Sequence, residues 1–410
     1  MIFFDKNRTK GKGRVKEIQE FLMLAKGYIH VDEWNSFDKI ALLIFFGICI
    51  YIVWIYSLLF TKKMLVYSDK NKKGNSNVGI SVIVAAKNEA ENLKKYLPYV
   101  LEQDYNNFEV IVVNDGSWDQ TQNVLEAFEI QYPHLKLCRT YDDEHQSHFS
   151  GKKLALTIGI KAAKYDQLLF TDADCMPISK HWIRNASQYI VKDDLTVLLG
   201  SYMKTNGLLN ACIRFETLKI ALTYAGFAAQ NNAYMSVGRN FAYKKSTFFD
   251  VNGFSKYLYV PSGDDDLFIQ ECKKANKSVG VLFSKSTKTV SEPKETFKQW
   301  YRQKRRHVST SSYYPKQTLI KLFVLEILQI LFFIGCPILL LFINIPFILT
   351  YSIFFVILGF VLFRWYRLLK LIDEKINVFL IPFYSVLVFL FQGIVGISNM
   401  INKPKNWMGV

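Results

Sequence analysis

The sequence predicts an α/β protein that is anchored in a membrane by about four transmembrane helices. Three observations carry this prediction: long apolar runs without charges, β-branched runs that alternate with helical segments, and acidic residues at the ends of those β-branched runs. Of the 410 residues, 50% are hydrophobic and 15% are aromatic. This composition excludes a disordered or collagen-like chain, and six cysteines are too few for a disulfide scaffold.

The apolar runs are long enough to cross a bilayer. Residues 40–60 contain no charge and would form a helix about 31 Å long. A second run is interrupted at 344–346 and predicts a helical hairpin over 321–363, and a fourth helix is expected at 377–397. Glu326 and Gln329 lie one turn apart in the hairpin, where they either line a polar cavity or reach toward the membrane interface.

Flanking charge sets the expected orientation. Five lysines follow the first run, at 62, 63, 70, 72 and 73, whereas the segment just before it carries Asp32, Glu33 and Asp38. We expect a multi-pass protein of the cell (inner) membrane, and the positive-inside rule gives its orientation. The block 61–320 and the loop 364–376 are expected in the cytoplasm, and the tails 1–39 and 398–410 outside.

Two basic segments run against this orientation. Lys403 and Lys405 lie in the tail that the rule places outside, and the stretch 6–16 is also basic. The second of these could reflect an upstream choice of start residue, with Met23 as the alternative.

The block 61–320 shows the alternation of an α/β sheet. Strands are expected at 79–86, 108–113, 135–139 and 167–171, and helices at 91–102, from Ser117 or Asp119 to about 128, and at 152–164. Such an order predicts a mostly parallel sheet with right-handed crossovers. Ligands of these sheets bind at the carboxyl ends of the strands, where Lys87, Asp115 and the pair Asp172/Asp174 fall.

Several site types are excluded by motif. The chain has no GxGxxG after its first strand, no GxxxxGK[ST], no Cys/His cluster with zinc spacing and no GxSxG. Asp172 and Asp174 remain, and on an extended chain they point to the same side. Because two close carboxylates repel each other, they favour a hard cation such as Mg²⁺ or Mn²⁺. A turn or helix cap is the alternative explanation.

Two further clusters precede the hairpin. Asp264, Asp265 and Asp266 form an acidic run before an apolar helix, where acids also favour the helix N-terminus. Residues 298–306, KQWYRQKRR, contain five cations and no acid, and predict an amphipathic helix at the membrane surface. The net charge of +16 implies anionic partners. Nucleic acid fits poorly, because much of this charge flanks the apolar runs.

In their order and spacing, these motifs resemble the membrane-bound family 2 glycosyltransferases of the GT-A fold, a Rossmann-like nucleotide-diphospho-sugar transferase fold. Cellulose, hyaluronan, chitin and poly-N-acetylglucosamine synthases belong to this family. The resemblance covers about residues 78–310 and extends to the flanking apolar helices. It rests on VIVAAKNEAENL at 82–93, VVNDGSWDQT at 112–121, GKKLAL at 151–156, FTDADC at 170–175, GDDDLF at 263–268 and QKRRH at 303–307.

The resemblance implies roles for the donor side of the site. Ala85, Glu89 and Asp115 would hold the nucleotide base and ribose, and Lys152 would lie near the diphosphate. Asp172 and Asp174 would hold a Mg²⁺ or Mn²⁺ ion, with Asp174 making most of the contact.

It also implies roles for the acceptor side. Asp265 would be the general base, and a shift of the motif by one residue would make Asp266 the base instead. Independently of the resemblance, Asp264 is expected to cap the following helix. Gln303, Arg306 and His307 would contact the acceptor and the pyrophosphate, whereas a second frame, Gln299 to Arg302, fits less well. Gly238-Arg239-Asn240 would line the acceptor site.

The implied activity is inverting transfer of a sugar from a nucleotide-sugar, expected to be a UDP-sugar, to a polysaccharide or lipid-linked glycan. Such a hexosyltransferase would have membrane lipid and export or assembly proteins as further partners, and no nucleic acid. His307 stands where relatives carry a Trp beneath the acceptor sugar, which puts processive synthesis in doubt. The alternatives are a single-sugar transferase to a lipid phosphate or simple lipid, and a non-enzymatic membrane protein with a degenerate domain.

Overall fold

The structure is a computed structural model that describes residues 35–60, 77–140, 151–260, 262–343 and 347–402. It divides into two compact units. One contains the described residues of Met1–Ile55 and Leu325–Phe363, and the other those of Tyr56–Val324 and Arg364–Val410. The lysines at 62–73 and the hairpin tip at 344–346, on which the predicted orientation depends, lie outside the described residues.

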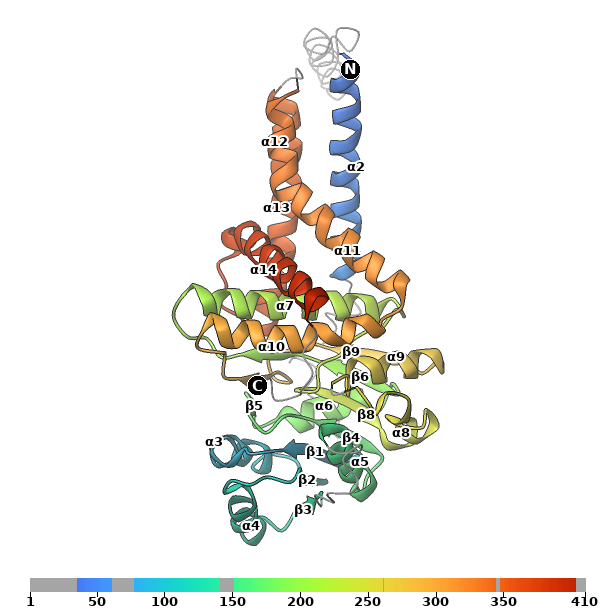
Figure 1. The fold of residues 1–410 in the computed structure, drawn as a ribbon, viewed down its shortest axis with the longest axis vertical. Coiled ribbons are helices and arrows are strands. Elements are labelled where there is room, and N and C mark those ends of the chain that lie inside the picture. The colour runs from blue at the N-terminus through green and yellow to red at the C-terminus, as the bar shows by residue number, and fades with distance from the viewer. Residues whose placement is uncertain (1–34, 61–76, 141–150, 261, 344–346, 403–410) are drawn as a thin grey trace, which may run out of the picture. The chain divides into compact units, whose positions relative to one another are not determined.

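The larger unit is built on a seven-stranded mixed sheet (Figure 1), in the order β3-β2-β1-β4-β8-β6-β9. Its strands are β1 (Ile80–Ala86), β2 (Phe108–Asn114), β3 (Leu135–Arg139), β4 (Gln167–Phe170), β6 (Leu195–Leu198), β8 (Phe241–Lys244) and β9 (Val279–Leu282). The four strands expected from the sequence are confirmed and are parallel to one another. Strand β8 runs antiparallel to both of its neighbours, and the other neighbouring pairs are parallel, so the predicted mostly parallel sheet is confirmed.

A small second sheet lies beyond the ends of the main strands. It has the order β5-β10-β7, with β5 (Cys175–Pro177), β7 (Gly200–Tyr202) and β10 (Thr289–Ser291). Strand β5 directly follows the Asp172/Asp174 pair, and β7 follows β6 after one residue. The small sheet is therefore connected to the main sheet next to the strand ends that carry the predicted site residues.

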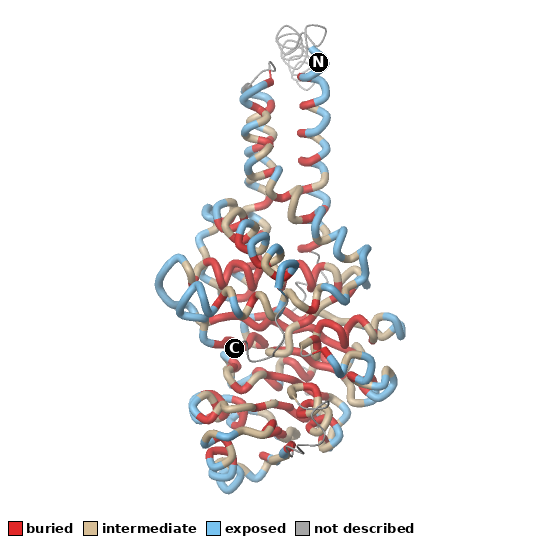
Figure 2. Tube along the Cα trace, viewed as in Figure 1, coloured by how far each residue is buried: buried red, intermediate tan, exposed pale blue. Residues whose placement is uncertain are grey.

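Helices cover both faces of the main sheet. They are α3 (Ala90–Leu101), α4 (Thr121–Gln131), α5 (Lys152–Ala162), α6 (Trp182–Ile190), α7 (Leu208–Ala229), α8 (Lys245–Asp250), α9 (Asp266–Lys274) and α10 (Phe297–Ser309). Side chains of α3, α4 and α6 form one core with Ile80, Val82 and Val84 of β1. On the other face, α5 approaches Ile83 of β1 and Val113 of β2. Figure 2 shows the buried positions gathered in the strands and in α7.

Within the described residues, four helical segments are long and apolar enough to cross a membrane: Ser36–Leu59, Lys316–Leu341, Ile348–Ile372 and Val378–Ile401. These belong to α2 (Ser36–Leu59), α11 (Lys316–Ile330), the π-helical turn η5 (Leu331–Gly335), α12 (Cys336–Leu341), α13 (Phe347–Ile372), the short η6 (Val378–Leu380) and α14 (Ile381–Ile401). The second segment begins earlier than the predicted position 321. Gln329 is buried in it, whereas Glu326 is half-buried.

Gly159 sets how closely α5 lies on the sheet. A Cβ atom at this position would stand 2.8 Å from Cγ2 of Ile83 and 3.1 Å from Cγ2 of Val113. Both neighbours are fully buried strand residues, so they have little room to move.

We therefore expect Gly159→Ala to lower the free energy of unfolding by about 1–2 kcal/mol, because overpacking outweighs the gain in helix propensity. Thermal unfolding of the detergent-solubilised protein measures the change. Gly396→Ala in α14 is the matched control, since its added methyl group would meet no atom within 4 Å. Equal melting temperatures for the two variants would contradict the tight contact.

Candidate active site

The loops after β1 and β2 are tied to each other by hydrogen bonds. Asn88 N donates to Ser117 Oγ over 2.9 Å, and Trp118 N donates to Asn88 Oδ1 over 3.0 Å. Asn88 adopts a left-handed backbone with φ 56°, which asparagine tolerates better than most residues. Ser117 is thus used to join the loops, and α4 begins later than predicted, at Thr121, whose N–H donates to Asp119 Oδ1.

Asp115 stands at the end of β2 with one oxygen atom unused. Its side chain is buried, and Oδ1 accepts a hydrogen bond from Thr140 Oγ1 over 3.1 Å. Oδ2 lies 3.8 Å from Lys87 Nζ and accepts no hydrogen bond from the described residues. A buried carboxylate oxygen without a donor is costly, so it marks a place where a ligand's N–H or O–H group would bind. Ala85, half-buried, lies at the adjacent end of β1.

Lys152 joins the two acidic motifs. At the first turn of α5, its Nζ lies 2.9 Å from Asp172 Oδ1 and 3.0 Å from Asp264 Oδ2. Burial alone would lower the pKa of Lys152, but the neighbouring carboxylates, Asp172 first among them, raise it well above its ordinary value. The lysine is therefore charged. A small cavity of about 10 Å³ lies against Lys152, Asp172, Gly238, Asp264 and Asp265, with room for about one water.

The Asp172/Asp174 pair fits a divalent cation. Asp172, Asp174 and Cys175 each offer one ligand atom, and these atoms lie within 4.8 Å of one another. Burial and then the charge of Asp172 raise the pKa of Asp174. The pKa of Glu89 is raised by burial and, less strongly, by both aspartates. A bound cation would remove this repulsion, and the carboxylate oxygens are the hard ligands that Mg²⁺ and Mn²⁺ prefer.

The acidic run divides into three roles, which correct one expectation. Asp265, rather than Asp264, caps α9: its Oδ1 accepts from Asp266 N over 2.8 Å. Its Oδ2 accepts from Gly238 N over 2.7 Å. Burial, followed by the charges of Asp264 and Asp266, raises the pKa of Asp265 to about 8. Asp264 instead pairs with Lys152.

Asp266 is committed to holding the structure together. Its Oδ2 accepts from Thr310 Oγ1 over 2.7 Å and from Tyr314 OH over 2.6 Å, and its Oδ1 accepts from Leu267 N over 2.8 Å. These bonds join the start of α9 to the segment after α10. Asp266 accepts three hydrogen bonds and is buried, whereas Asp265 accepts one at each oxygen and is half-buried, so Asp266 suits the role of base less well.

The predicted acceptor residues of α10 meet an aromatic side chain that the sequence did not indicate. Gln303 Nε2 donates to Tyr202 OH over 3.1 Å, and the Arg239 guanidinium lies 4.3 Å from the centre of the Tyr202 ring. Arg239 also donates to Ser291 Oγ over 3.1 Å. Gln303 Oε1 is buried and has no hydrogen-bond partner among the described residues. Strand β7, which carries Tyr202, is too short to be recognised from its sequence.

The remaining polar residues of α10 differ in their contacts and exposure. Gln299 forms a capping box with Thr296 at the start of the helix, so the alternative frame from Gln299 to Arg302 is used for structure. Arg306 and His307 follow Gln303 by one turn, and Arg306 is half-buried while His307 is exposed. The structure thus groups Asp172, Asp174, Lys152 and the acidic run closely, with Ala85 and Asp115 at neighbouring strand ends and the α10 residues on a separate element.

Comparison with known proteins identifies the domain. Residues 81–251 match the family model described as Glycosyl transferase family 2. Glycosyltransferase GlyG of Streptococcus pneumoniae serotype 4 is 29% identical over 123 residues, which are 30% of this chain and 38% of GlyG. The poly-beta-1,6-N-acetyl-D-glucosamine synthase of Staphylococcus epidermidis is 30% identical over 151 residues, 36% of this chain and 33% of the synthase. The chain thus matches only 38% and 33% of the lengths of these two relatives.

The fold also matches a solved structure. Mannosyltransferase PcManGT from Pyrobaculum calidifontis, in complex with GDP-Man and Mn²⁺, superposes with a TM-score of 0.52 at 15% identity. The superposition covers 90% of this chain and 99% of the mannosyltransferase, and at this identity it shows the fold alone. The chain therefore contains a glycosyl transferase family 2 domain of the GT-A fold, as its motifs predicted.

Proposed function

We propose that this protein is a membrane-bound, inverting glycosyltransferase that moves a sugar from a nucleotide-diphospho-sugar to a hydroxyl group of a polysaccharide or lipid-linked glycan. The observation that carries the proposal is the position of Lys152 between Asp172 and Asp264. The Lys152 ammonium group thus links the carboxylate pair that is suited to a metal ion with the acidic run that contains Asp265. The names of the relatives, a glycosyltransferase and a polysaccharide synthase, agree with this activity.

The donor would bind across the ends of β1 and β2. The unused oxygen of Asp115 would accept a hydrogen bond from the nucleotide, beside Ala85 and Glu89. We expect a UDP-sugar as the donor. Asp172 and Asp174 would hold a Mg²⁺ or Mn²⁺ ion, which when bound offsets the negative charge of the leaving diphosphate. Lys152 is placed to bind diphosphate oxygens, and Arg306 supplies further positive charge from α10.

Asp265 would accept the proton of the attacking hydroxyl group. Gly238 N and Asp266 N hold its carboxylate in place, and each oxygen keeps a lone pair for a further hydrogen bond. Attack from the side opposite the diphosphate inverts the anomeric carbon in one displacement, so no second carboxylate is required as a nucleophile.

A second candidate function is transfer of a single sugar to a lipid phosphate or simple lipid. The exposed His307 favours it, because the family resemblance implies a Trp beneath the acceptor at this position. Radiolabelled transfer by purified membranes, measured with a panel of nucleotide-sugars and with Mg²⁺ or Mn²⁺, tests both. A polymeric product supports the first function, a single-sugar lipid the second, and no transfer from any nucleotide-sugar would overturn both.

The cation site predicts a specific loss. We expect Asp174→Ala to weaken Mn²⁺ binding by more than about tenfold, because one ligand is removed from a half-buried carboxylate pair. Electron paramagnetic resonance of free Mn²⁺, with and without UDP, measures binding independently of turnover. Asp250→Ala is the control, since this exposed acid pairs only with Lys277 among the described residues. Unchanged Mn²⁺ binding in Asp174→Ala would remove the pair from the proposal.

The base predicts a pH profile. Asp265 must be ionised to accept a proton, so kcat/KM for the donor, which reports ionisation of the unliganded enzyme, should rise with pH up to the Asp265 pKa of about 8 and level off above it. Asp265→Asn should lower the rate by about 10² to 10⁴ and abolish this rise. The amide can satisfy only one of the two backbone N–H groups that Asp265 accepts from, so lost rate alone would be ambiguous.

Asp264→Asn helps to distinguish loss of the base from loss of a backbone hydrogen bond. Removing the neighbouring negative charge should shift the rise to lower pH, because the charge of Asp264 helps to raise the pKa of Asp265. Donor affinity, measured by calorimetry, should change by only a few-fold in Asp265→Asn. A rise in rate with pH that persists in Asp265→Asn would show that the base lies elsewhere.

A further inference from the structure

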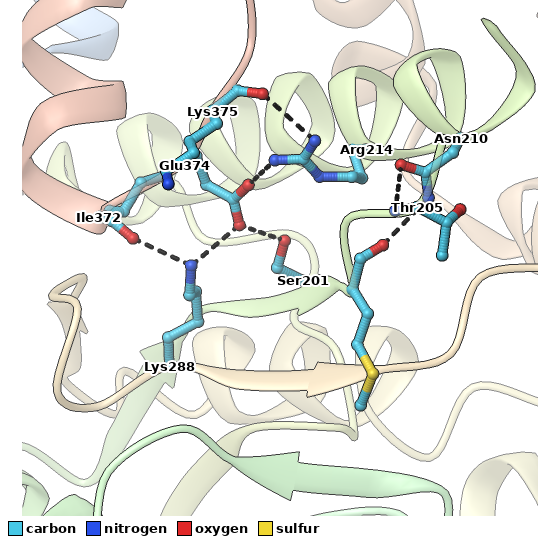
Figure 3. Close-up of polar contacts among 9 residues, drawn as sticks. Ser201, Thr205, Asn210, Arg214, Lys288, Ile372, Glu374 and Lys375 are labelled. Carbon is cyan, nitrogen blue, oxygen red and sulfur yellow. Dashed lines mark hydrogen bonds and ion pairs between the residues drawn. The ribbon is translucent and has the colours of Figure 1, made fainter. Parts of the chain in front are cut away.

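Helix α14 is held against α7 near its start and against α10 near its end. Close to the start, the ring centre of Tyr384 lies 5.6 Å from that of Phe215 of α7. The segment leading into it is fixed by Glu374, whose carboxylate contacts Arg214 of α7, Lys288 Nζ over 2.9 Å and Ser201 Oγ over 2.8 Å (Figure 3). Lys288 Nζ also donates to the carbonyl oxygen of Ile372 over 3.0 Å. The Glu374 side chain is only 4% exposed, so this is a buried network of charges rather than a surface contact.

The other end of α14 is held by α10. Tyr301 OH donates to Ser398 Oγ over 2.6 Å, and Arg305 Nε donates to Asn399 Oδ1 over 3.0 Å. Asn399 Nδ2 returns a bond to the carbonyl oxygen of Arg305 over 2.8 Å. Between the two ends, Trp300 stacks on Phe391 with ring centres 3.7 Å apart. Helix α14 therefore lies along α10 and α7 (Figure 1).

These contacts conflict with a transmembrane course for α14. Its 21 residues extend for about 31 Å, close to the thickness of the hydrocarbon core. A helix that crossed the bilayer would leave its ends on opposite sides, and only one end could touch a domain on one side. The partner helix α10 also carries five cations over 298–306, which are costly inside hydrocarbon.

The face of α14 that points away from the domain is apolar. Its buried face consists of Ile381, Tyr384, Ser385, Val388, Phe391, Val395 and Asn399. The opposite face forms a stripe of Leu390, Ile394, Ile397 and Ile401, each more than half exposed. An exposed apolar stripe beside a cationic helix matches the boundary between acyl chains and phosphate groups of a lipid layer.

We propose that α14 is an interfacial helix, which lies flat in one leaflet with the stripe Leu390–Ile401 in contact with lipid, rather than the fourth membrane span that hydropathy predicts. This inference rests on the proposed membrane location. It keeps the tail after α14 on the same side as the glycosyltransferase domain. Lys403 and Lys405, which oppose the four-span orientation, then agree with the positive-inside rule.

Spin-label depth measurements test the proposal directly. Single cysteines replace Leu390, Ile394, Ile397 and Ile401 in a Cys138→Ser background, because Cys138 is the one of the six native cysteines, all in described residues, that is not buried. The labelled protein is reconstituted in phosphatidylcholine vesicles containing one-quarter phosphatidylglycerol. We expect the four labels at equal depth within a few ångströms. A change of about 16 Å from Leu390 to Ile401 would establish a span, and labels in water would show that the stripe does not contact lipid.

Exposed positions on α13 provide the control. Labels at Ile348, Phe355 and Phe363 should change depth by about 22 Å along the helix, because α13 is expected to cross the bilayer. Equal depths for the three labels on α13 would refute the expected membrane crossing of α13. The depths measured on α14 would still decide whether α14 lies flat.

Reporter fusions give a second, independent test. A fluorescent reporter after Val410 and one after Lys73 should both score cytoplasmic. Opposite sides for the two reporters would overturn the interfacial assignment while leaving the proposed function intact. Both reporters outside the cytoplasm would leave α14 as proposed but would remove access of the domain to cytosolic nucleotide-sugars.

Discussion

A single ammonium group, Lys152 Nζ, lies between carboxylates from two distant parts of the chain, Asp172 after β4 and Asp264 before α9. The Asp264 side chain is 10% exposed and the Asp172 side chain 30%, and the ammonium group offsets the repulsion between these two negative charges. The lysine is positioned by the first turn of α5, which packs on the sheet at Gly159. The close approach of helix and strands therefore fixes the charge that holds the two acidic motifs together.

A second set of buried polar contacts aligns the helices around this centre. Asp266 joins the start of α9 to Thr310 and Tyr314, just after α10. Lys304 of α10 pairs with Glu216 of α7 over 2.8 Å, with Glu216 only 1% exposed. Breaking a buried pair from one side leaves an uncompensated charge, so these contacts specify one arrangement of the helices strongly. The cationic helix α10 is thus part of the domain's packing as well as of its surface.

The sequence predicted the parts of the fold that repeat a strong pattern. The strands β1 to β4 and their intervening helices are confirmed. Strands β1, β2 and β4 are largely continuous apolar runs, whereas β3 alternates apolar and polar residues. The short strands β5, β7 and β10 have three residues each, too few for any periodicity. Tyr202 was missed for that reason. The order of roles among Asp264, Asp265 and Asp266 was also beyond pattern, because Gly263, with φ 96°, sets which aspartate meets the helix.

Hydropathy likewise could not distinguish a helix that crosses a membrane from one that lies on it. Both α13 and α14 are long and apolar, and the contacts of α14 with α7 near its start and α10 near its end led us to propose different courses for them. Strand β7 contacts both the segment before α14 and the candidate site, because neighbouring residues of a strand point to opposite faces. Ser201 donates to Glu374 on one face, and Tyr202 meets Gln303 and Arg239 on the other. The segment that leads into α14 and the proposed acceptor side of the site therefore share one short strand, so the same backbone positions both.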